Sequence, residues 1–337
     1  MQISKLFSFI FTFQVLVFSF CESQQCNKDN PITTISVSQG GNANFKTIQS
    51  AIDSIPAGNS KWIHITVDSG VYKEKVILPN TKPCVFLEGA GKEQTSVQWG
   101  DSGTAHHTST FELQANYTLV KGITFQNNHN IVDEKKNVTP AVATRVHADK
   151  CTFIDCGFVG VQDTLFDSFG RHYYYNCYIH GHTDFIFGKG QSIFQDCKIY
   201  FGSGIAEPRD GVITANYRSS LDDPSAFVFK NCSIDGSPGI KTNLGRALEL
   251  GNPRVIISDS YLADVIRPEG WNEVQAFVGS ERNITFVEVG CRGPGSNMSG
   301  RVSWINKLSD SEINKLLDLS FIDNEGWTSN FPIKIIA

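Results

Sequence analysis

The feature that most constrains the fold is a six-residue pattern that recurs along the middle of the chain. Its third position is Asp or Asn, its fourth is Cys or Ser, and large apolar residues flank both. Apolar and polar residues alternate in each copy, which is typical of a short β-strand with two different faces. The five copies are Phe153–Phe158, Tyr174–Ile179, Phe194–Ile199, Phe229–Ile234 and Ile257–Leu262.

The spacing of these copies indicates a solenoid. Successive fourth positions are 21, 20, 35 and 28 residues apart, which corresponds to one turn of short strands plus a loop of variable length. Weaker copies precede them at Val85–Gly89 and Leu119–Phe125. Stacked turns place the fourth positions in one inward ladder and the Asp or Asn at the adjacent bend. We therefore predict an all-β, single-stranded parallel β-helix; a sandwich of short strands is the alternative, but it leaves the repeated Asp/Asn-Cys pair unexplained.

The start of the chain predicts export. Lys5 precedes an apolar run from Leu6 to Phe20, and small residues flank Glu22. This pattern is typical of a secretory signal over residues 1–23, and the run is shorter than a membrane span of about 18 to 20 residues. Residues 24–337 then form one domain. Five N-x-[ST] sites are candidate glycosylation sites: Asn116, Asn137, Asn231, Asn283 and Asn297.

Eight cysteines follow the predicted signal, and an even number in an oxidising compartment permits disulfides. The repeat predicts that Cys156, Cys177, Cys197 and Cys232 form an inward ladder, where thiols pack as small hydrophobic groups. Some of these cysteines can still be bridged. Cys197 and Cys232 lie on neighbouring turns, so we predict one disulfide between them.

Both ends of the repeat region carry helix signals. Asn44 precedes an apolar pattern that Pro56 ends, which predicts a short helix closing the first turn. Near the other end, Ser309 and Glu312 have the spacing of a capping box before an apolar helix face. We expect these helices to cap the solenoid.

Several function classes are disfavoured. The chain has 29 Lys and Arg against 34 Asp and Glu, a formal charge of -5 and no basic run, so it lacks the electrostatic pattern of a nucleic-acid-binding protein. The cysteines lack paired C-x2-C spacing, and His180 and His182 do not form H-x3-H, so we predict no metal site. Gly100–Gly103 resembles a serine-protease loop, but the rest of that pattern is missing and Ser102 is interpreted as a loop serine.

Two aspartates are the strongest catalytic candidates. Asp163 and Asp184 are 21 residues apart, which matches the local repeat and predicts that they stack on adjacent turns. A carboxylate pair in apolar surroundings does not easily hold two charges, so one pKa rises. One group then serves as a proton donor and the other as a nucleophile or base. Arg246 is a candidate to orient one of them. The alternative is a pair of turn residues or a solvated polar ladder.

Aromatic residues near these aspartates are candidates to face sugar rings, although most can equally belong to the core. They are Phe166, Tyr173, Phe185, Phe187 and Trp271.

These motifs resemble those of the plant pectin methylesterases, carbohydrate esterases built on a right-handed parallel β-helix of the pectin lyase type. The resemblance runs from about Ile35 to Pro332. It rests on four motifs in the family's order: Gly70–Glu74, Gln162–Leu165, Asp184–Gly188 and Leu244–Arg246. The chain is similar to the short form of the family, without an N-terminal inhibitor-like region.

The resemblance implies a reaction and its residues. Asp184 would attack the methyl-ester carbonyl of a galacturonate in pectin. Asp163 would protonate the departing methanol and then act as base. Gln162 would bind the oxyanion, and Arg246 would hold Asp184. No cofactor or metal is implied. The residues implied to bind substrate are Phe166, Phe187, Arg246, Leu248 and Trp271. We expect a secreted monomer of the cell wall whose partners are methyl-esterified homogalacturonan and a proteinaceous pectinesterase inhibitor, with no nucleic acid and no membrane.

Two departures from the family motifs leave an alternative open. Where many members have Gln-Ala-Val-Ala, this chain has Pro140–Ala143, and a tryptophan of the family is replaced by Leu248. Loss of one oxyanion donor costs about 10² to 10³ in rate. The alternative is a catalytically impaired pectin-binding or structural wall protein; a depolymerase of the same architecture is disfavoured because its motifs are missing. The pI of 5.9 also predicts an activity optimum below that of a basic relative.

Overall fold

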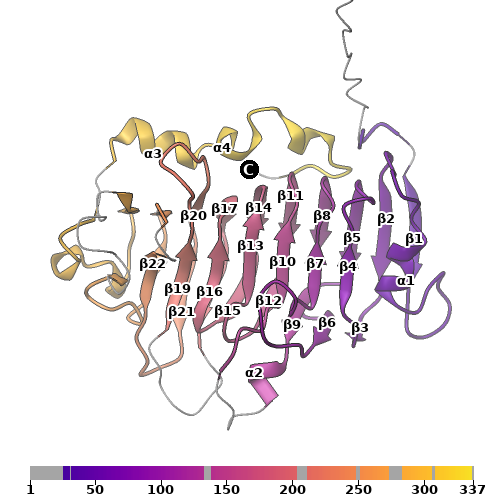
Figure 1. Cartoon of the computed structure of the whole chain (residues 1–337), viewed down its shortest axis with the longest axis horizontal. Coiled ribbons are helices and arrows are strands. Elements are labelled where there is room, and N and C mark those ends of the chain that lie inside the picture. The colour runs from indigo at the N-terminus through magenta and orange to yellow at the C-terminus, as the bar shows by residue number, and fades with distance from the viewer. Residues whose placement is uncertain are drawn as a thin grey trace, which may run out of the picture.

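The computed structural model describes residues 26–30, 32–132, 138–202, 211–247, 251–272, 283–305 and 308–335. Within these residues the chain forms three parallel sheets that stack turn upon turn into an elongated parallel β-helix (Figure 1). The prediction of a β-helix is confirmed, and the sandwich is excluded because every strand pair between turns is parallel. The winding is right-handed, as parallel crossover connections almost always are.

Each turn from β2 to β25 contributes one strand to each sheet, and β1 and β26 extend one sheet at its two ends. The ten-stranded sheet contains β1 (Thr33–Val37), β2 (Ile63–Val67), β5 (Val85–Gly89), β8 (Thr118–Lys121), β11 (Cys151–Ile154), β14 (Arg171–Tyr175), β17 (Gln191–Gln195), β20 (Ala226–Lys230), β23 (Arg254–Ser258) and β26 (Thr285–Val289). The sheet that we call the site sheet contains β4 (Val76–Leu78), β7 (Phe111–Leu113), β10 (Thr144–His147), β13 (Leu165–Phe169), β16 (Thr183–Gly188), β19 (Val212–Asn216), β22 (Asn243–Ala247) and β25 (Trp271–Asn272). The third sheet contains β3 (Gly70–Tyr72), β6 (Thr95–Trp99), β9 (Thr124–Asn127), β12 (Gly157–Val159), β15 (Tyr178–Gly181), β18 (Lys198–Phe201), β21 (Ser233–Gly236) and β24 (Tyr261–Leu262).

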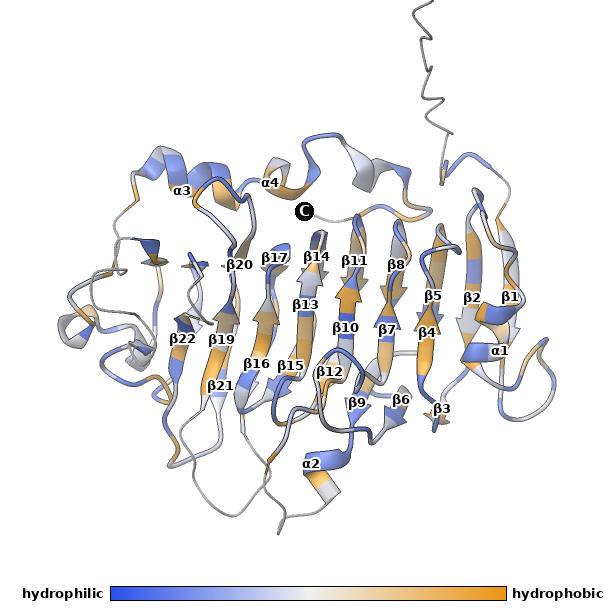
Figure 2. Cartoon of the chain, viewed as in Figure 1, coloured by the Kyte–Doolittle hydropathy of each residue, from blue (hydrophilic) through white to orange (hydrophobic). Residues whose placement is uncertain are grey.

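The repeat seen in the sequence forms stacked ladders. Its first positions pair in register, and the rings of Phe153, Tyr174, Phe194 and Phe229 stack with centroids 5.1, 4.4 and 4.7 Å apart. Its third positions all adopt left-handed backbone, with φ between 50° and 55°, which Asp and Asn tolerate better than most residues. The recurring Asp or Asn is therefore explained by the sharp bend between the ten-stranded and third sheets. The strands carry most of the apolar residues and the connecting loops are mostly hydrophilic (Figure 2).

The cysteine ladder is buried and unbridged. Cys156, Cys177, Cys197 and Cys232 are at most 1% exposed, which confirms the inward ladder. The predicted Cys197–Cys232 disulfide is wrong, because each thiol contacts a backbone carbonyl of the preceding turn instead; for Cys232 the sulfur lies 3.3 Å from the Phe194 oxygen. Among the described residues the disulfide joins Cys26 to Cys84.

The helices are α1 (Ile48–Asp53), α2 (His129–Val132), α3 (Asp310–Leu317) and α4 (Ser320–Asp323), with 3-10 turns at Pro294–Ser296, Met298–Gly300 and Trp327–Asn330. Helix α1 packs against β1 and β4 at the N-terminal end, as predicted. Its N-cap is Thr47, whose hydroxyl accepts from the Ser50 amide, whereas Asn44 binds the amide and hydroxyl of Ser36.

The C-terminal segment differs from its predicted place. The capping box of Ser309 and Glu312 is present at the start of α3. However, α3 and α4 lie along the outer face of the ten-stranded sheet rather than across the last turn (Figure 1). That outer face is apolar and has to be shielded from water. The cluster that covers it includes Phe86, Tyr173, Ile193, Val228, Ile313, Leu316, Ile322 and Trp327.

Candidate active site

The two candidate aspartates lie on neighbouring turns of the site sheet. Gln162 forms an isolated β-bridge with Thr183, and Leu165 pairs with Ile186 in the sheet. The same offset of 21 residues therefore holds on both sides of the aspartates. The Asp163 amide donates to the Thr183 carbonyl at 3.0 Å. Since neighbouring strands are about 4.8 Å apart, this register brings Asp163, just before β13, and Asp184, on β16, onto adjacent turns, as the repeat predicted.

Both aspartates depart from regular strand geometry. Asp163 and Asp184 have φ values of 62° and 48°. The pairing of β16 with β19 shifts between Thr183 and Ile186, so that Asp184 lies in a bulge. Bulges re-aim side chains and are common beside active sites. Left-handed backbone at a residue other than glycine costs of order 1–3 kcal/mol and persists only where the surroundings impose it.

Arg246 holds Asp184 through two hydrogen bonds. Its Nε donates to Oδ1 at 2.8 Å and its Nη2 donates to Oδ2 at 2.6 Å. The two side chains are 17% and 14% exposed, so the pair is shielded but reachable from the surface. A bidentate guanidinium fixes both the orientation and the negative charge of a carboxylate. Arg246 lies on β22, two strands beyond the strand that carries Asp184. The strand register places Arg246 near the same face of the sheet as Asp184.

Asp163 has the opposite electrostatic character. The residue is 9% exposed. Burial, and secondarily the charge of Asp184, raise its pKa from 3.8 to about 7, against the opposing effect of Arg246. Asp163 therefore carries a proton at mildly acidic pH, beside an Asp184 whose carboxylate is paired with Arg246. One group able to donate a proton and one able to attack a carbon stand side by side.

Phe166 and Phe187 form an aromatic wall next to the aspartates. They follow Asp163 and Asp184 by three residues on β13 and β16, pair in register, and stack with centroids 4.3 Å apart and planes 13° apart. They line a cavity of about 510 Å³ that opens to the surface. An aromatic face of this kind is suited to contact a sugar ring.

Comparison with models of known protein families identifies the family of this chain. The Pectinesterase model matches residues 34–325 of the chain. The chain belongs to the pectinesterase family. It is 46% identical to probable pectinesterase 29 of Arabidopsis thaliana over 302 residues, covering 88% of this chain and 89% of the relative. It is 44% identical to probable pectinesterase 55 of the same plant, covering 89% and 91%.

Solved structures agree with the fold of this pectinesterase family member. The pectin methylesterase from carrot superposes with a TM-score of 0.80 at 27% identity, covering 89% of this chain and 96% of that structure. A pectin methylesterase from Aspergillus niger gives a TM-score of 0.75 at 25% identity, covering 90% and 98%. The likeness spans almost the whole chain.

Three aromatic residues expected at the site of this pectinesterase family member lie elsewhere. Trp271 is 1% exposed, stacks on Phe286 at 4.3 Å and donates to Glu288, so its predicted role in substrate binding is wrong. Phe185 is in the core inside the solenoid, and Tyr173 lies beneath the C-terminal helices. Strand alternation decides which face a side chain takes, and none of the three faces the site. Leu248 lies outside the described residues.

Gln162 and Pro140 occupy neighbouring turns. Gln162 is half-buried, and its carbonyl accepts from the Ala141 amide at 3.2 Å. The Pro140 carbonyl accepts from the Gly103 amide at 3.0 Å. Proline has neither an amide hydrogen nor a side-chain donor, so Pro140 itself has no hydrogen bond to donate to an oxyanion.

Sequence reasoning missed four groups that line the same cavity. Arg145, His147, Phe169 and Lys189 surround the Phe166–Phe187 wall. The strand register carried a signal for one of them: Arg145, Phe166, Phe187 and Arg246 lie in one row across the site sheet. His147, Phe169 and Lys189 come from strand ends and loops, where no periodicity marks them.

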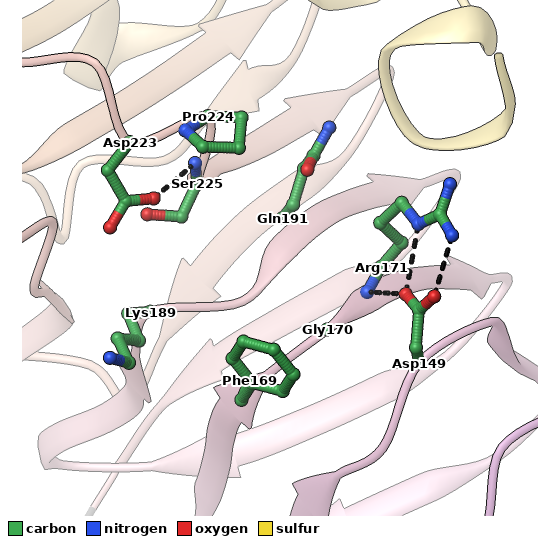
Figure 3. Close-up of a pocket in the computed structure, with 9 residues that line it drawn as sticks. All are labelled: Asp149, Phe169, Gly170, Arg171, Lys189, Gln191, Asp223, Pro224 and Ser225. Atoms are coloured by element: carbon green, nitrogen blue, oxygen red, sulfur yellow. Dashed lines mark hydrogen bonds and ion pairs between the residues drawn. The ribbon is translucent and has the colours of Figure 1, made fainter. Parts of the chain in front are cut away.

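A second cavity of about 350 Å³ adjoins the first, since Phe169 and Lys189 line both. Figure 3 shows it with Arg171 held by Asp149 at one end and Lys189 at the other. The Asp223 carboxylate accepts from the Ser225 amide at 3.0 Å. This cavity therefore contains two basic and two acidic side chains.

A Ser-His-Asp cluster lies inside the solenoid and is closed to substrate. His172 is bonded through one ring nitrogen to Asp167 and through the other to the Ala148 carbonyl, while Ser192 also donates to Asp167. The three side chains are 0% exposed. Burial alone would lower the pKa of His172, but the Asp167 charge and hydrogen bond outweigh burial, so the pKa of His172 is raised. Ser102 is exposed in a loop.

The remaining predictions concern glycosylation, metal binding and membrane association. Asn116, Asn231 and Asn297 are exposed and Asn283 is half-buried, whereas Asn137 lies outside the described residues. Among the described residues there is no group of three His, Cys, Asp or Glu placed to hold a metal ion. The described helices include none long and apolar enough to cross a membrane.

Proposed function

We propose that this chain is a pectin methylesterase that hydrolyses the methyl esters of homogalacturonan to pectate and methanol. The observation that carries the proposal is the asymmetric aspartate pair: Asp184 is clamped by Arg246, and Asp163 has a pKa raised to about 7. Membership of the pectinesterase family and the likeness to the carrot pectin methylesterase support the same substrate class.

In the proposed first step, a carboxylate oxygen of Asp184 attacks the C6 carbonyl carbon of a methylated galacturonate. Negative charge develops on the carbonyl oxygen, where the Gln162 side chain would donate a hydrogen bond. Asp163 gives its proton to the methoxy oxygen, the C–O bond breaks, and methanol leaves. The product is an anhydride between Asp184 and the uronate.

In the second step, Asp163 is ionised and accepts a proton from water as the water attacks the uronate carbonyl carbon of the anhydride. Collapse of this intermediate restores the Asp184 carboxylate and releases the uronic acid, which loses its proton to solvent to give galacturonate. Asp163 ends the cycle protonated, as it began. A pKa near operating pH suits a group that must both give and take a proton.

The proposal extends to where the protein acts. Residues 1–23 would be removed as a secretory signal, and residues 24–337 would act in the cell wall as a monomer, with a proteinaceous pectinesterase inhibitor as a further partner. The exposed sequon residues Asn116, Asn231 and Asn297 are compatible with glycosylation during export.

The test is methanol release from highly methylated pectin by the secreted protein. Asp184→Asn should abolish release, because an amide is not a nucleophile here. Asp155→Asn is the matched control: Asp155 has a similar φ of 52° but lies at a bend between the ten-stranded and third sheets.

The proposal is overturned if a folded wild-type protein releases no methanol between mildly acidic and neutral pH. Pectin binding without methanol release would establish instead the impaired wall protein that Pro140 and Leu248 suggested. New reducing ends would identify a depolymerase.

A further inference from the structure

A buried arginine without a partner lies in the loop that follows β19. Arg218 is 4% exposed, and its Nε is shielded from water and has no hydrogen-bond acceptor. The rest of its guanidinium has no hydrogen-bond or ion-pair partner among the described residues. Arginine is almost never this deeply buried unless it is paired, because an uncompensated charge loses its hydration. The surroundings of Arg218 therefore lack an acceptor that its charge requires.

A second arginine, Arg254, packs against the same loop. Its amide donates to the Asn216 side chain at 2.8 Å, and the Asn252 amide donates to the Arg218 carbonyl at 2.8 Å. The Nη2 of Arg254 donates to the Asp223 carbonyl at 2.8 Å, whereas its Nε is buried and has no acceptor. Each of the two packed segments thus brings a guanidinium N–H that no described residue satisfies.

The carboxylate nearby does not neutralise the two arginines by contact. The charge of Asp223 acts on both guanidinium groups, but its oxygens accept from the Ser225 amide at 3.0 Å and the Ser219 amide at 3.1 Å (Figure 3). Burial, and secondarily the charge of Arg218, lower the pKa of Arg254 to about 10, against the effect of Asp223. Two guanidinium charges and one carboxylate leave this region of the fold positive.

We propose that the guanidinium groups of Arg218 and Arg254 hold a chloride ion. An anion between them would accept from both unsatisfied Nε–H groups and offset the positive charge that remains. A monatomic ion suits so enclosed a place better than phosphate or sulfate, whose four oxygens each need room and donors. The site is separate from the aspartate pair and does not depend on the proposed esterase function.

The bound ion would brace the strand end beside the active site. The Tyr217 amide donates to the Gly188 carbonyl at 2.8 Å, and the Asn216 side chain donates to the same oxygen at 3.2 Å. Gly188 ends β16, which carries Asp184, and Tyr217 lines the cavity of about 510 Å³. An ion that binds only the folded chain stabilises it in proportion to the logarithm of its concentration.

The first test measures thermal unfolding in sodium chloride and in sodium methanesulfonate at equal ionic strength. Chloride at about ten times its dissociation constant should raise the Tm of the wild type by about 2 °C. Arg218→Gln should lose this difference. The control Arg292→Gln removes the same charge from an exposed arginine and should keep it. No difference in the wild type, or an equal difference in Arg218→Gln, would overturn the proposal.

The second test needs no variant. Wild-type crystals soaked in sodium bromide should show an anomalous peak within hydrogen-bonding distance of Nε of both Arg218 and Arg254. A water molecule or a side-chain oxygen in that place, without an anomalous peak, would overturn the chloride site. A peak without any chloride-specific change in Tm would show an adventitious ion only, and would also overturn it. Neither test uses methanol release, so the esterase function stands or falls separately.

Discussion

Replacing Asp163 by Asn should stabilise the protein while removing its activity, and the stabilisation should depend on pH. The folded protein holds the pKa of this carboxyl at about 7, whereas its ordinary value is 3.8. A raised pKa means that the folded state binds the proton more tightly than the unfolded chain. Ionised Asp163 therefore destabilises the fold increasingly as pH rises from about 4 to about 7. An amide cannot ionise and avoids this cost.

The magnitude follows from the pKa difference. One pH unit is worth about 1.4 kcal/mol, so the full cost is about 4 kcal/mol above pH 7. By the same relation, about 2 kcal/mol of it is present at pH 5. Asp163→Asn should therefore raise the free energy of unfolding by about 4 kcal/mol at pH 8 and by about 2 kcal/mol at pH 5. The backbone does not oppose the change, because Asn tolerates the φ of 62° as well as Asp does.

The assay is reversible urea denaturation of both proteins at pH 5 and pH 8, with methanol release measured in parallel. Asp155→Asn again serves as the control for introducing Asn at a left-handed position. A gain for Asp163→Asn that is equal at the two pH values would refute the reasoning, because it would show that ionisation of Asp163 carries no stability cost. Methanol release by the wild type should fall as pH rises through about 7, as the proton that Asp163 donates is lost.

Two further changes test the structure of the site and the fold. Arg246→Lys should lower kcat/KM on methylated pectin by at least about 100-fold, since a single ammonium cannot reproduce the bidentate hold on Asp184; activity within threefold of wild type would contradict that role. Cys84→Ser should lower the free energy of unfolding by about 4 kcal/mol, because the Cys26–Cys84 bridge closes a loop of 58 residues. Cys232→Ala should lower the free energy of unfolding by less, about 1–2 kcal/mol, and leave the thiol count lower by one. If urea denaturation shows an equal loss of unfolding free energy in both variants, the bridge constrains the unfolded chain little.

The proximity of the two aspartates was predictable from sequence because a solenoid converts spacing into proximity. When turns stack in register, residues one repeat apart become neighbours, so the separation of Asp163 and Asp184 by 21 residues placed them on adjacent turns. The same argument placed Phe153, Tyr174 and Phe194 in one ladder. In such a fold local sequence carries long-range contacts.

The aromatic predictions succeeded or failed according to the face that each strand presents. Phe166 and Phe187 lie on the outer face of the site sheet, whereas Phe185, two residues before Phe187 and beside the Asp184 bulge, points into the core. Trp271 also points inward. A composition rich in aromatic residues cannot assign faces, because burial and exposure follow from register and from bulges.

The sequence by itself determined the architecture, the stacked turns and the two aspartates, because each follows from a periodic pattern within neighbouring repeats. Tertiary structure alone decided the rest. Burial by surrounding turns and the charge of Asp184 raise the pKa of Asp163, Arg246 reaches Asp184 from 62 residues away, and Cys26 meets Cys84 rather than a ladder cysteine. Lys189 and Arg145 also line one cavity because of the tertiary structure. These outcomes depend on which loops and strand ends meet in space, and no repeat in the sequence encodes that.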